Sequence, residues 1–429
     1  MMRKELLGRM FRTAAMIMII SMLAGACSKN NGPEKPEDNT GQTTGPGGNG
    51  SGDQGGSGDQ GNSGNEGGSG DEGGNEGGTS GGDHGGSGDS GDQGGSGGSG
   101  DQGDQPKPQI TANSWMTAID DDTKIAMLTI PGTHDAATST CAGPGKCQTL
   151  TISGQLEHGV RAFDLRPTMD DNSTLGNIYH SILDTGVSMG NAMEYFDSFL
   201  KAHPGEGIIV IMRYESERQI FGSIAEDNYK TAMKNFLWDN RIYQSRMAAF
   251  NRSMTMKDLR GKILIISRND LSPVSTFETA YTQWSHSNSV GEALQIYGTG
   301  GLGRIYVQDM YSAEKNGNSS EADFLAKKKE LVCKLLDITV PFREYEQNNW
   351  VINYCSGYAG SSFASDSYAK NAASANPAAL EHIQAHTGKG FTGIVMMDYA
   401  GTDTYEVGGS TFSISGKSLT EALIMNNFQ

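Results

Sequence analysis

The stretch Ala126-Met-Leu-Thr-Ile-Pro-Gly-Thr-His-Asp135 joins a short apolar run to a turn and a pair of titratable residues. A continuous apolar run of this length is typical of a strand that is buried on both faces of a parallel sheet. Seven comparable runs follow, at 161–165, 177–179, 207–212, 262–266, 304–307, 350–353 and 393–397. Helical patterns lie between them, at 189–203, 226–238, 321–336, 378–386 and 418–425.

Strands that alternate with helices predict an α/β protein. We expect an irregular TIM-type (β/α)8 barrel, which need not close completely. A doubly wound open sheet is the alternative, because it is built from the same strand-helix-strand units.

The first 27 residues have the organisation of an export signal. Basic residues precede an apolar run at 14–24, and small residues lead from there to Cys27. The end of this segment, Leu23-Ala-Gly-Ala-Cys27, resembles a bacterial lipobox, so we expect Cys27 to carry the lipid of an exported lipoprotein. An uncleaved membrane anchor is the alternative, although a spanning helix needs roughly 20 apolar residues.

Residues 28–108 form a linker of low complexity. Residues 41–104 alone hold 30 of the 60 glycines, among Ser, Asp, Gln, Asn and Glu. Such a segment cannot bury enough apolar surface to offset the entropy lost on ordering, so we expect a disordered tether. This leaves 109–429 as the folded barrel.

The formal net charge of −17 excludes one class of function. Residues 31–108 carry 14 acidic residues against two lysines, and the remainder is also acidic overall. A nucleic-acid binder would instead show clustered basic residues. In an exported chain the four cysteines after Cys27 can form disulfides. A local Cys141–Cys147 pair is the simplest arrangement, and the state of Cys333 and Cys355 stays open.

Titratable or polar residues directly follow seven of the eight predicted strands. A barrel of this kind has its active site at the C-terminal ends of its strands. Burying so many charges around one mouth is costly without a ligand or mutual pairing. In chain order the residues are His134 and Asp135, Asp164 and Arg166, His180, Arg213 and Glu215, Arg268, Asp309 and Tyr311, and Asp398 and Tyr399.

This set of side chains suits phosphoryl transfer to a hydroxyl group. Two histidines with carboxylates nearby can act as base and acid, and a guanidinium between them can bind a phosphate. The remaining Arg and Asp side chains suit the hydroxyls of a polyol ring. Asp135, Asp164 and Glu215 could instead hold a divalent cation. Because Arg166 and Arg213 would bring positive charge into the same pocket, we expect a metal-free site.

At these residues the sequence resembles the bacterial phosphatidylinositol-specific phospholipase C family. The likeness extends from Trp115 to Asn427. The motifs that carry it, in order, are Trp115-Met, Ile130-Pro-Gly-Thr-His-Asp135, Gly159-Val-Arg-Ala-Phe-Asp-Leu-Arg166, Arg260-Gly-Lys-Ile-Leu-Ile-Ile-Ser-Arg268, Val307-Gln-Asp-Met-Tyr311 and Met397-Asp-Tyr399.

The resemblance implies a role for each catalytic candidate. His134, supported by Asp398, would be the general base that takes the proton from the inositol 2-hydroxyl. Arg166 would bind the phosphate. His180, paired with Asp135, would protonate the leaving diacylglycerol oxygen, so the products would be diacylglycerol and inositol 1,2-cyclic phosphate.

The resemblance also implies the substrate contacts and the subclass. Asp164 would support the phosphate site, Arg213, Arg268 and Asp309 would bind inositol hydroxyls, and Tyr311 would stack on the ring. Calcium-dependent relatives have a carboxylate where this chain has its phosphate-binding arginine, so no cofactor is expected. Three positions depart from the family pattern: His180 lies in Tyr-His-Ser rather than His-His-Gly, Ala136 replaces a serine, and Arg213 replaces a lysine.

The expected protein is therefore a lipid-tethered monomer of the bacterial cell envelope, at the outer membrane or cell surface. Its expected partners are membranes that contain phosphatidylinositol, or glycosylated anchors of this lipid. Aromatic residues at 281–286, Tyr358, Phe363 and Tyr368 either dip into the bilayer interface or pack long loops. A metal-dependent glycerophosphodiesterase or sphingomyelinase-like phospholipase, and a non-catalytic lipoprotein that binds glycans or inositol lipids, are the alternative functions.

Overall fold

The computed structural model describes residues 110–169, 174–215, 226–238, 241–270, 280–285, 289–298, 300–312, 320–360 and 364–429. The export signal with Cys27 and most of the linker lie outside these ranges, so both remain predictions. None of the helices in the described ranges combines the length and the apolar character that a membrane span needs.

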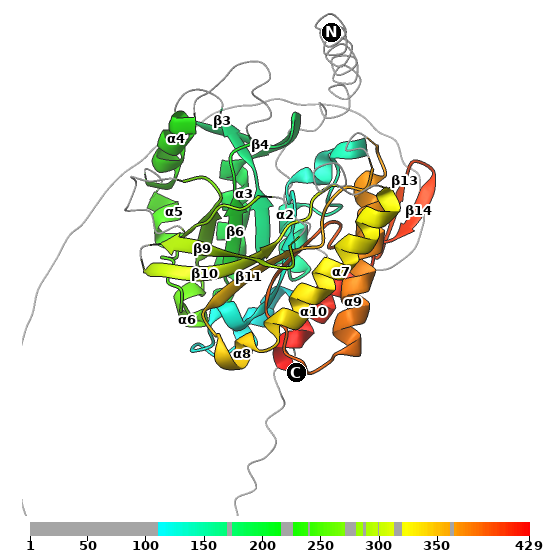
Figure 1. Cartoon of the computed structure of the whole chain (residues 1–429). Helices are drawn as coiled ribbons and strands as arrows, with labels where there is room; N and C mark the ends of the chain where they lie inside the picture. Colours follow the sequence, from blue (N-terminus) through cyan, green and yellow to red (C-terminus); the bar gives the residue numbers. More distant parts are fainter. Residues whose placement is uncertain are drawn as a thin grey trace, which may run out of the picture. The chain divides into compact units, whose positions relative to one another are not determined.

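The central sheet is a closed barrel of nine strands. It is therefore a TIM-type barrel and not the open sheet of the alternative prediction (Figure 1). The order of these strands around the barrel is β1-β12-β11-β10-β9-β8-β7-β6-β2. The bounds are β1 Thr129–Thr133, β2 Ala162–Leu165, β6 Ile208–Met212, β7 Ile263–Ser267, β8 Ala280–Tyr281, β9 Glu292–Gly298, β10 Gly301–Gln308, β11 Asn349–Tyr354 and β12 Gly393–Met397. Neighbouring strands run parallel except where β9 pairs with β8 and β10.

The prediction was wrong for the third apolar run. Residues 177–179 belong to β4 (Leu175–His180), the middle strand of a separate antiparallel sheet with β3 (Pro167–Met169) and β5 (Leu183–Ser188). Along β4 half-buried and buried residues alternate, as expected for a sheet with one face toward solvent. Strands β8 and β9 complete the barrel instead, and β9 escaped prediction because its side chains alternate in exposure.

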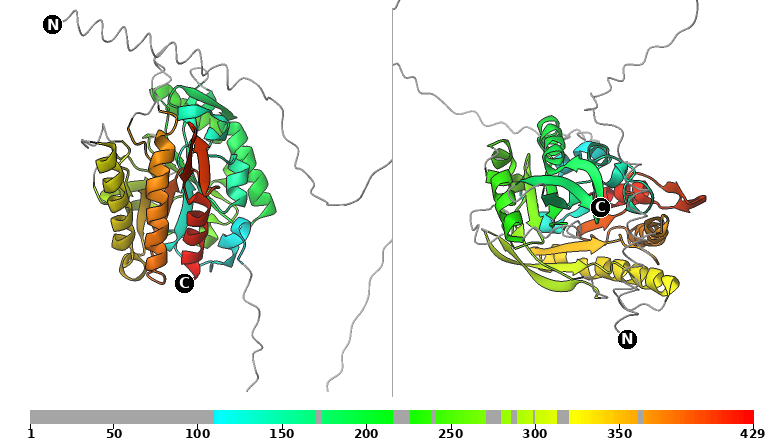
Figure 2. Two further views of the ribbon diagram at one scale, coloured as in Figure 1. Left: turned by 90° about the vertical axis from the view of Figure 1, so that its right-hand side faces the viewer. Right: turned by 90° about the horizontal axis from the view of Figure 1, so that it is seen from above.

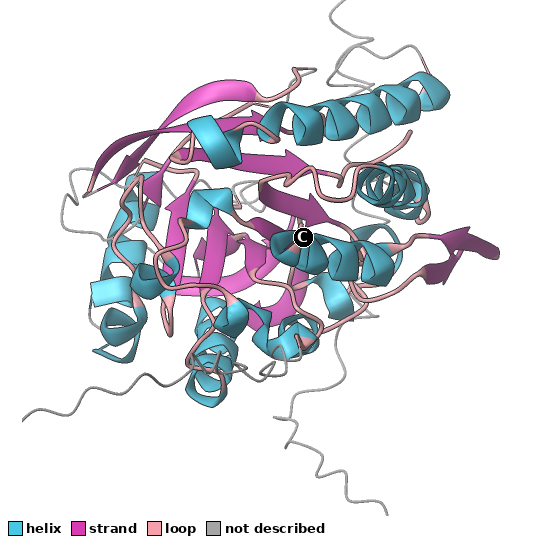
Figure 3. Cartoon of the chain, turned by 90° about the horizontal axis from the view of Figure 1, so that it is seen from below, coloured by secondary structure: helices cyan, strands magenta, loops and turns pink. Residues whose placement is uncertain are grey.

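Helices lie around most of the barrel and leave the side of β9 and β10 uncovered, as the view from below shows (Figure 3). They are α2 Ile152–Glu157, α3 Met189–Ala202, α4 Glu226–Trp238, α5 Arg241–Arg246, α6 Met256–Leu259, α7 Glu321–Thr339, α8 Phe342–Tyr345, α9 Ser367–Ala385 and α10 Gly416–Met425. Helices α7, α9 and α10 lie side by side (Figure 2). A hairpin of β13 (Thr404–Val407) and β14 (Ser410–Ser413) projects beside them.

The register of the barrel decides which side chains meet at its mouth. Strands β1 and β12 pair from Thr129 with Gly393 to Thr133 with Met397. His134 and Asp398, the next residue of each strand, therefore leave the barrel side by side.

The predicted disulfide is absent among the described residues. Cys141 and Cys147 are both buried and no disulfide joins them, and Cys333 and Cys355 form none with each other. The thiol of Cys147 lies instead close to the side chains of His180 and Asp135. The loop that carries Cys147 therefore lines the barrel mouth.

Candidate active site

His134 and Asp398 form the first pair of the site. Nδ1 of His134 lies 2.9 Å from Oδ1 of Asp398, and both side chains are fully buried. Burial, followed by the charges of Arg166 and His180, lowers the pKa of His134 well below its ordinary value. When Asp398 accepts the Nδ1–H of a neutral imidazole, Nε2 is left as a base.

The carboxylate of Asp135 lies between the two histidines. Its Oδ2 is 3.1 Å from Nε2 of His134 and 3.5 Å from Nε2 of His180. The sum of these distances, 6.6 Å, is therefore the upper limit of the separation between the two Nε2 atoms. Imidazoles this close can each reach a different oxygen of one phosphate, since a proton-transfer contact spans about 2.6–3.2 Å.

The backbone is strained beside the catalytic candidates. Asp135 has a φ of 44°, Ser181 next to His180 has 58°, and Tyr399 next to Asp398 has 57°. Residues other than glycine rarely adopt this left-handed region, and such strain clusters at functional sites. The sharp turns aim the side chains into the barrel mouth.

Arg166 binds the other side of Asp135. Its Nε lies 3.0 Å from Oδ1 of Asp135, its Nη2 donates to Oδ2 of Asp164 at 2.8 Å, and its Nη1 is 3.9 Å from Glu215. Burial alone would lower the pKa of Arg166, but these three carboxylates raise it well above its usual value. The guanidinium is therefore a permanent cation beside both imidazoles.

His180 is held by a loop and by a tyrosine. Its Nδ1–H donates to the carbonyl of Gly145 at 2.9 Å, which leaves Nε2 as the acceptor. The Tyr368 hydroxyl is 3.0 Å from Nε2, and Tyr311 adds its own hydroxyl at 3.1 Å from that of Tyr368. Asp135, the predicted partner of His180, approaches Nε2 to 3.5 Å, whereas Gly145 and Tyr368 lie closer to the two ring nitrogens.

A second group of side chains lines the adjoining part of the mouth. Arg213 donates to Glu215 at 3.2 Å. The guanidinium of Arg268 lies 4.0 Å over the ring of Trp284, whose Nε1–H donates to Asp309 at 2.9 Å. Arginines and carboxylates that alternate in this way offer both donors and acceptors to a polyhydroxylated ring.

Several buried polar atoms at this mouth have no hydrogen-bond partner within the described residues: His134 Nε2, Asp135 Oδ2, Asp398 Oδ2, Arg213 Nε and Tyr354 Oη. An unsatisfied buried polar group costs about 1–3 kcal/mol. Their convergence indicates a site built for a polar ligand.

The structure brings the predicted site residues of the barrel domain to this one mouth, and it adds four to which the sequence pattern assigned no catalytic or substrate-binding role. These are Tyr354, Tyr368, Trp284 and Cys147. Tyr354 ends β11 and directly follows the predicted strand at 350–353, the one predicted strand to which no site residue had been assigned. The other three come from loops or a helix start, where no strand end signals a site residue.

Three of the aromatic residues that the sequence offered for contact with a bilayer are buried, and Tyr281 is half-buried. Tyr358, Tyr368 and Trp284 are 6%, 3% and 6% exposed, so they pack loops as the alternative interpretation expected. Phe363 lies outside the described residues.

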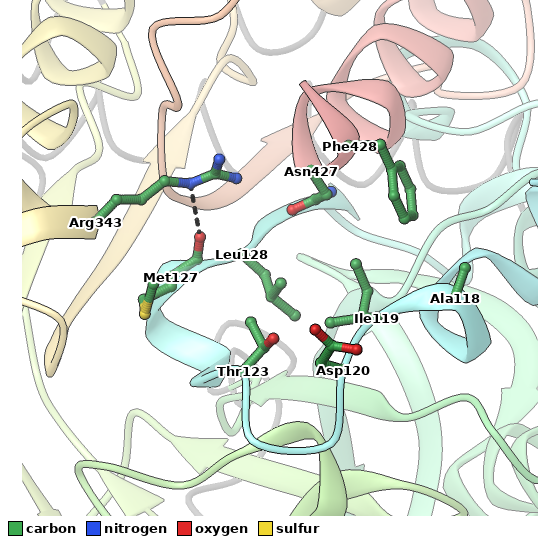
Figure 4. Close-up of a pocket in the computed structure, with 9 residues that line it drawn as sticks. All are labelled: Ala118, Ile119, Asp120, Thr123, Met127, Leu128, Arg343, Asn427 and Phe428. Atoms are coloured by element: carbon green, nitrogen blue, oxygen red, sulfur yellow. Dashed lines mark hydrogen bonds between the residues drawn. The ribbon is translucent and has the colours of Figure 1, made fainter. Parts of the chain in front are cut away.

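A separate pocket of about 310 Å³ lies at the opposite end of β1 (Figure 4). Leu128, which precedes β1, lines it, and Arg343 reaches across it to donate to the carbonyl of Met127 at 3.3 Å. No histidine or cysteine lines this pocket, so it carries none of the chemistry described above.

No protein-family model matches the chain. The 1-phosphatidylinositol phosphodiesterase of Listeria monocytogenes is 35% identical over 171 residues, which are 38% of this chain and 51% of that protein. The 1-phosphatidylinositol phosphodiesterase of Staphylococcus aureus strain Newman is 25% identical over 299 residues, which are 67% of this chain and 88% of that protein. The chain is therefore similar in sequence to bacterial 1-phosphatidylinositol phosphodiesterases. The match to the Listeria enzyme thus spans about half the length of that relative.

Solved structures of these phospholipases C share the fold. A variant of the phosphatidylinositol-specific phospholipase C from Staphylococcus aureus superposes with a TM-score of 0.58 at 23% identity, covering 73% of this chain and 97% of that one. The enzyme from Listeria monocytogenes gives 0.51 at 24% identity, covering 74% and 99%. At this identity the likeness establishes the TIM-type barrel.

Proposed function

We propose that this protein is a phosphatidylinositol-specific phospholipase C that cleaves phosphatidylinositol or its glycosylated form without a metal cofactor. Nε2 of His134 takes the proton of the inositol 2-hydroxyl, and the freed oxygen attacks the phosphorus. Nε2 of His180, protonated, gives its proton to the diacylglycerol oxygen as the phosphorus–oxygen bond breaks. The products are diacylglycerol and inositol 1,2-cyclic phosphate.

The observation that carries this proposal is the convergence of both imidazoles on a single carboxylate oxygen. Oδ2 of Asp135 lies between the two Nε2 atoms, as a phosphate oxygen would during the reaction. Arg166 touches the same carboxylate, so it is placed to stabilise charge on the equatorial oxygens of the phosphate. Electrostatic stabilisation by a fixed cation can take over the role that a metal ion fills elsewhere.

The substrate contacts follow from the remaining side chains. Arg213, Arg268 and Asp309 would bind inositol hydroxyls, and the unpartnered Nε of Arg213 provides one donor for them. Tyr311, whose ring lies 5.8 Å from that of His134, would cover the inositol ring beside the base.

The test is phosphorus NMR of the purified chain with phosphatidylinositol in the presence of EDTA. We expect the cyclic phosphate to accumulate as the phospholipid signal decays. Activity that vanishes with EDTA and returns with Mg²⁺ or Ca²⁺ would replace this proposal with a metal-dependent phosphodiesterase. Absence of any cleavage, or cleavage unchanged by both His134→Ala and His180→Ala, would indicate a binding lipoprotein.

We further propose that Cys27 anchors the protein in the bacterial cell envelope as a monomer, where it meets lipid substrates. The basis is the export signal with its lipobox, followed by the glycine-rich linker at 28–108. Such a linker has a reach on the order of 50 Å, from roughly 5–6 Å × √n. Labelling with a palmitate analogue in a bacterial host should mark the wild type and not Cys27→Ser, and equal labelling of both would contradict the assignment.

A further inference from the structure

Cys147 lies in the wall of the candidate active site, and the proposed reaction does not use it. Its sulfur is within 4.8 Å of ligand atoms of Asp135 and His180, and also of His134 and Asp398. Two backbone hydrogen bonds fix the residue. Its N–H donates to Thr138 at 3.1 Å, and its carbonyl accepts from Tyr399 at 2.8 Å.

Asp135, Cys147 and His180 bring three potential metal-ligand atoms within 4.8 Å of one another, and the one distance known between them fits a tetrahedral metal site. Nε2 of His180 and Oδ2 of Asp135 are 3.5 Å apart. Two ligand atoms that each lie about 2.0–2.1 Å from a tetrahedral Zn²⁺ are about 3.4 Å from each other. Imidazole nitrogen, carboxylate oxygen and thiolate sulfur are all ligand types that Zn²⁺ takes, and three protein ligands leave the fourth position open.

The hydrogen bond at Nδ1 of His180 fixes the tautomer that a metal ligand needs, with the proton on Nδ1 and the lone pair on Nε2. The carbonyl of Gly145 accepts the Nδ1–H, so the lone pair lies on Nε2, which is 3.5 Å from Oδ2 of Asp135. Metal-bound histidines regularly donate their other N–H to such an acceptor. The loop around Gly145 and Cys147 therefore supplies both the sulfur and the orienting carbonyl.

Two other groups of potential metal ligands lie at the barrel mouth, and both are less suitable for binding a cation. In the His134, Cys147 and Asp398 set, a 2.9 Å contact between Nδ1 and Oδ1 already occupies one nitrogen and one oxygen. In the His134, Asp135 and Asp164 set, Arg166 binds both carboxylates and would repel a cation.

The charges of the neighbouring side chains and the sulfur ligand decide which ion can bind. The cation of Arg166 disfavours any metal here, so the ligands must neutralise the added charge. A cysteine thiolate with the Asp135 carboxylate cancels the two charges of a divalent ion, and the thiol proton passes to solvent. A sulfur ligand favours soft or borderline ions such as Zn²⁺ over Mg²⁺ or Ca²⁺.

We propose that Cys147 Sγ, His180 Nε2 and Asp135 Oδ2 form an inhibitory site for Zn²⁺ or another thiophilic divalent cation. The ion would occupy the lone pair of His180 that the proposed reaction needs for its proton. Inhibition therefore rests on the proposed function, whereas binding of the ion does not.

The binding test uses Co²⁺ as the probe, added to the full chain under reducing conditions. Thiolate coordination to Co²⁺ gives a charge-transfer band in the near ultraviolet. We expect this band in the wild type and in Cys333→Ser, and its loss in Cys147→Ser. Tyr368→Phe should bind Co²⁺ more tightly than the wild type, because the hydroxyl that competes for Nε2 of His180 is then absent. The band should therefore appear at lower Co²⁺ concentrations.

The activity test measures phosphatidylinositol cleavage at increasing free Zn²⁺, with each variant compared with its own rate in EDTA. We expect Cys147→Ser to need at least about tenfold more zinc for half inhibition, as loss of a metal-site group commonly weakens affinity by 10–100-fold. Cys333→Ser should behave as the wild type. Far-ultraviolet circular dichroism shows that each variant is folded.

The outcomes separate the two proposals. A cobalt band that Cys147→Ser does not abolish, or zinc inhibition that is equal in Cys147→Ser and Cys333→Ser, would overturn the metal site. A cobalt band that depends on Cys147 in a protein that never cleaves phosphatidylinositol would support the site and overturn the function.

Discussion

Replacing Tyr368 with phenylalanine should make the enzyme faster. In the structure the Tyr368 hydroxyl lies 3.0 Å from Nε2 of His180, the atom that must face the leaving oxygen. Substrate binding has to break this hydrogen bond. A typical intramolecular hydrogen bond contributes a net 0.5–1.5 kcal/mol, so its removal should raise kcat/KM by about two- to twelvefold.

The same change should lower stability, because the folded protein loses that hydrogen bond. We expect the free energy of unfolding to fall by about 1 kcal/mol, measured by urea denaturation. The ring of Tyr368 stays, with its edge contact to the ring of His180 at a centroid distance of 5.3 Å. Tyr306→Phe is the matched control, because Tyr306 packs on Phe342 and its hydroxyl contacts Arg304 rather than a histidine.

A fall of kcat/KM in Tyr368→Phe, with Tyr306→Phe unchanged, would refute this reasoning. Tyr368 would then contact the substrate or assist proton transfer rather than compete with it. Equal rates in all three proteins would show that the hydrogen bond to His180 does not persist in solution.

Three further predictions follow from the buried charges. Because burial and the charges of Arg166 and His180 lower the pKa of His134, the acid limb of the pH profile of kcat/KM should lie below pH 6.5, and a limb at or above that pH would contradict the assignment of His134 as base. Arg166→Lys should reduce kcat by about 10²–10³, since an ammonium cannot make the paired contacts to a phosphate, and a loss under fivefold would remove Arg166 from the phosphate site. Burial lowers the pKa of Lys328 to about 8, from 10.5 in the unfolded chain, so the unfolded state binds more protons between these values and stability should rise with pH from 8. Urea denaturation at pH 8 and pH 9.5 should show this rise in the wild type and a smaller one in Lys328→Met, and equal slopes would contradict it.

The sequence predicts the α/β class and most of the barrel, because strands buried on both faces read as continuous apolar runs. Strands β6, β7 and β12 are wholly buried, and all three were located. The run at 177–179, which lies in β4, was wrongly placed in the barrel. A match of only three residues does not distinguish a barrel strand from a strand of an antiparallel sheet. Strand β9 was missed for the converse reason, because its alternating exposure leaves no apolar run.

The position of a residue relative to a strand end decided which site residues could be predicted from the sequence. Residues that directly follow a barrel strand, such as His134, Arg166 and Asp398, could be placed at the mouth from position alone. The partners of His180 could not, because Gly145 and Tyr368 come from a loop and a helix start that are distant in the sequence. The sequence also favoured a Cys141–Cys147 disulfide from loop length, although loop length does not reveal that the Cys147 sulfur lies beside His180 and Asp135.

The most direct test of the central claim, that His134 and His180 act as base and acid on one phosphate, is a comparison of leaving groups. His180→Ala and His134→Ala would be assayed on phosphatidylinositol and on an inositol phosphodiester with a p-nitrophenyl leaving group. A general acid contributes typically 10²–10⁴-fold, and p-nitrophenolate leaves without protonation. We therefore predict that His180→Ala loses this factor on the lipid and little of it on the nitrophenyl ester, whereas His134→Ala loses it on both. Equal losses of His180→Ala on the two substrates would contradict its role as the acid.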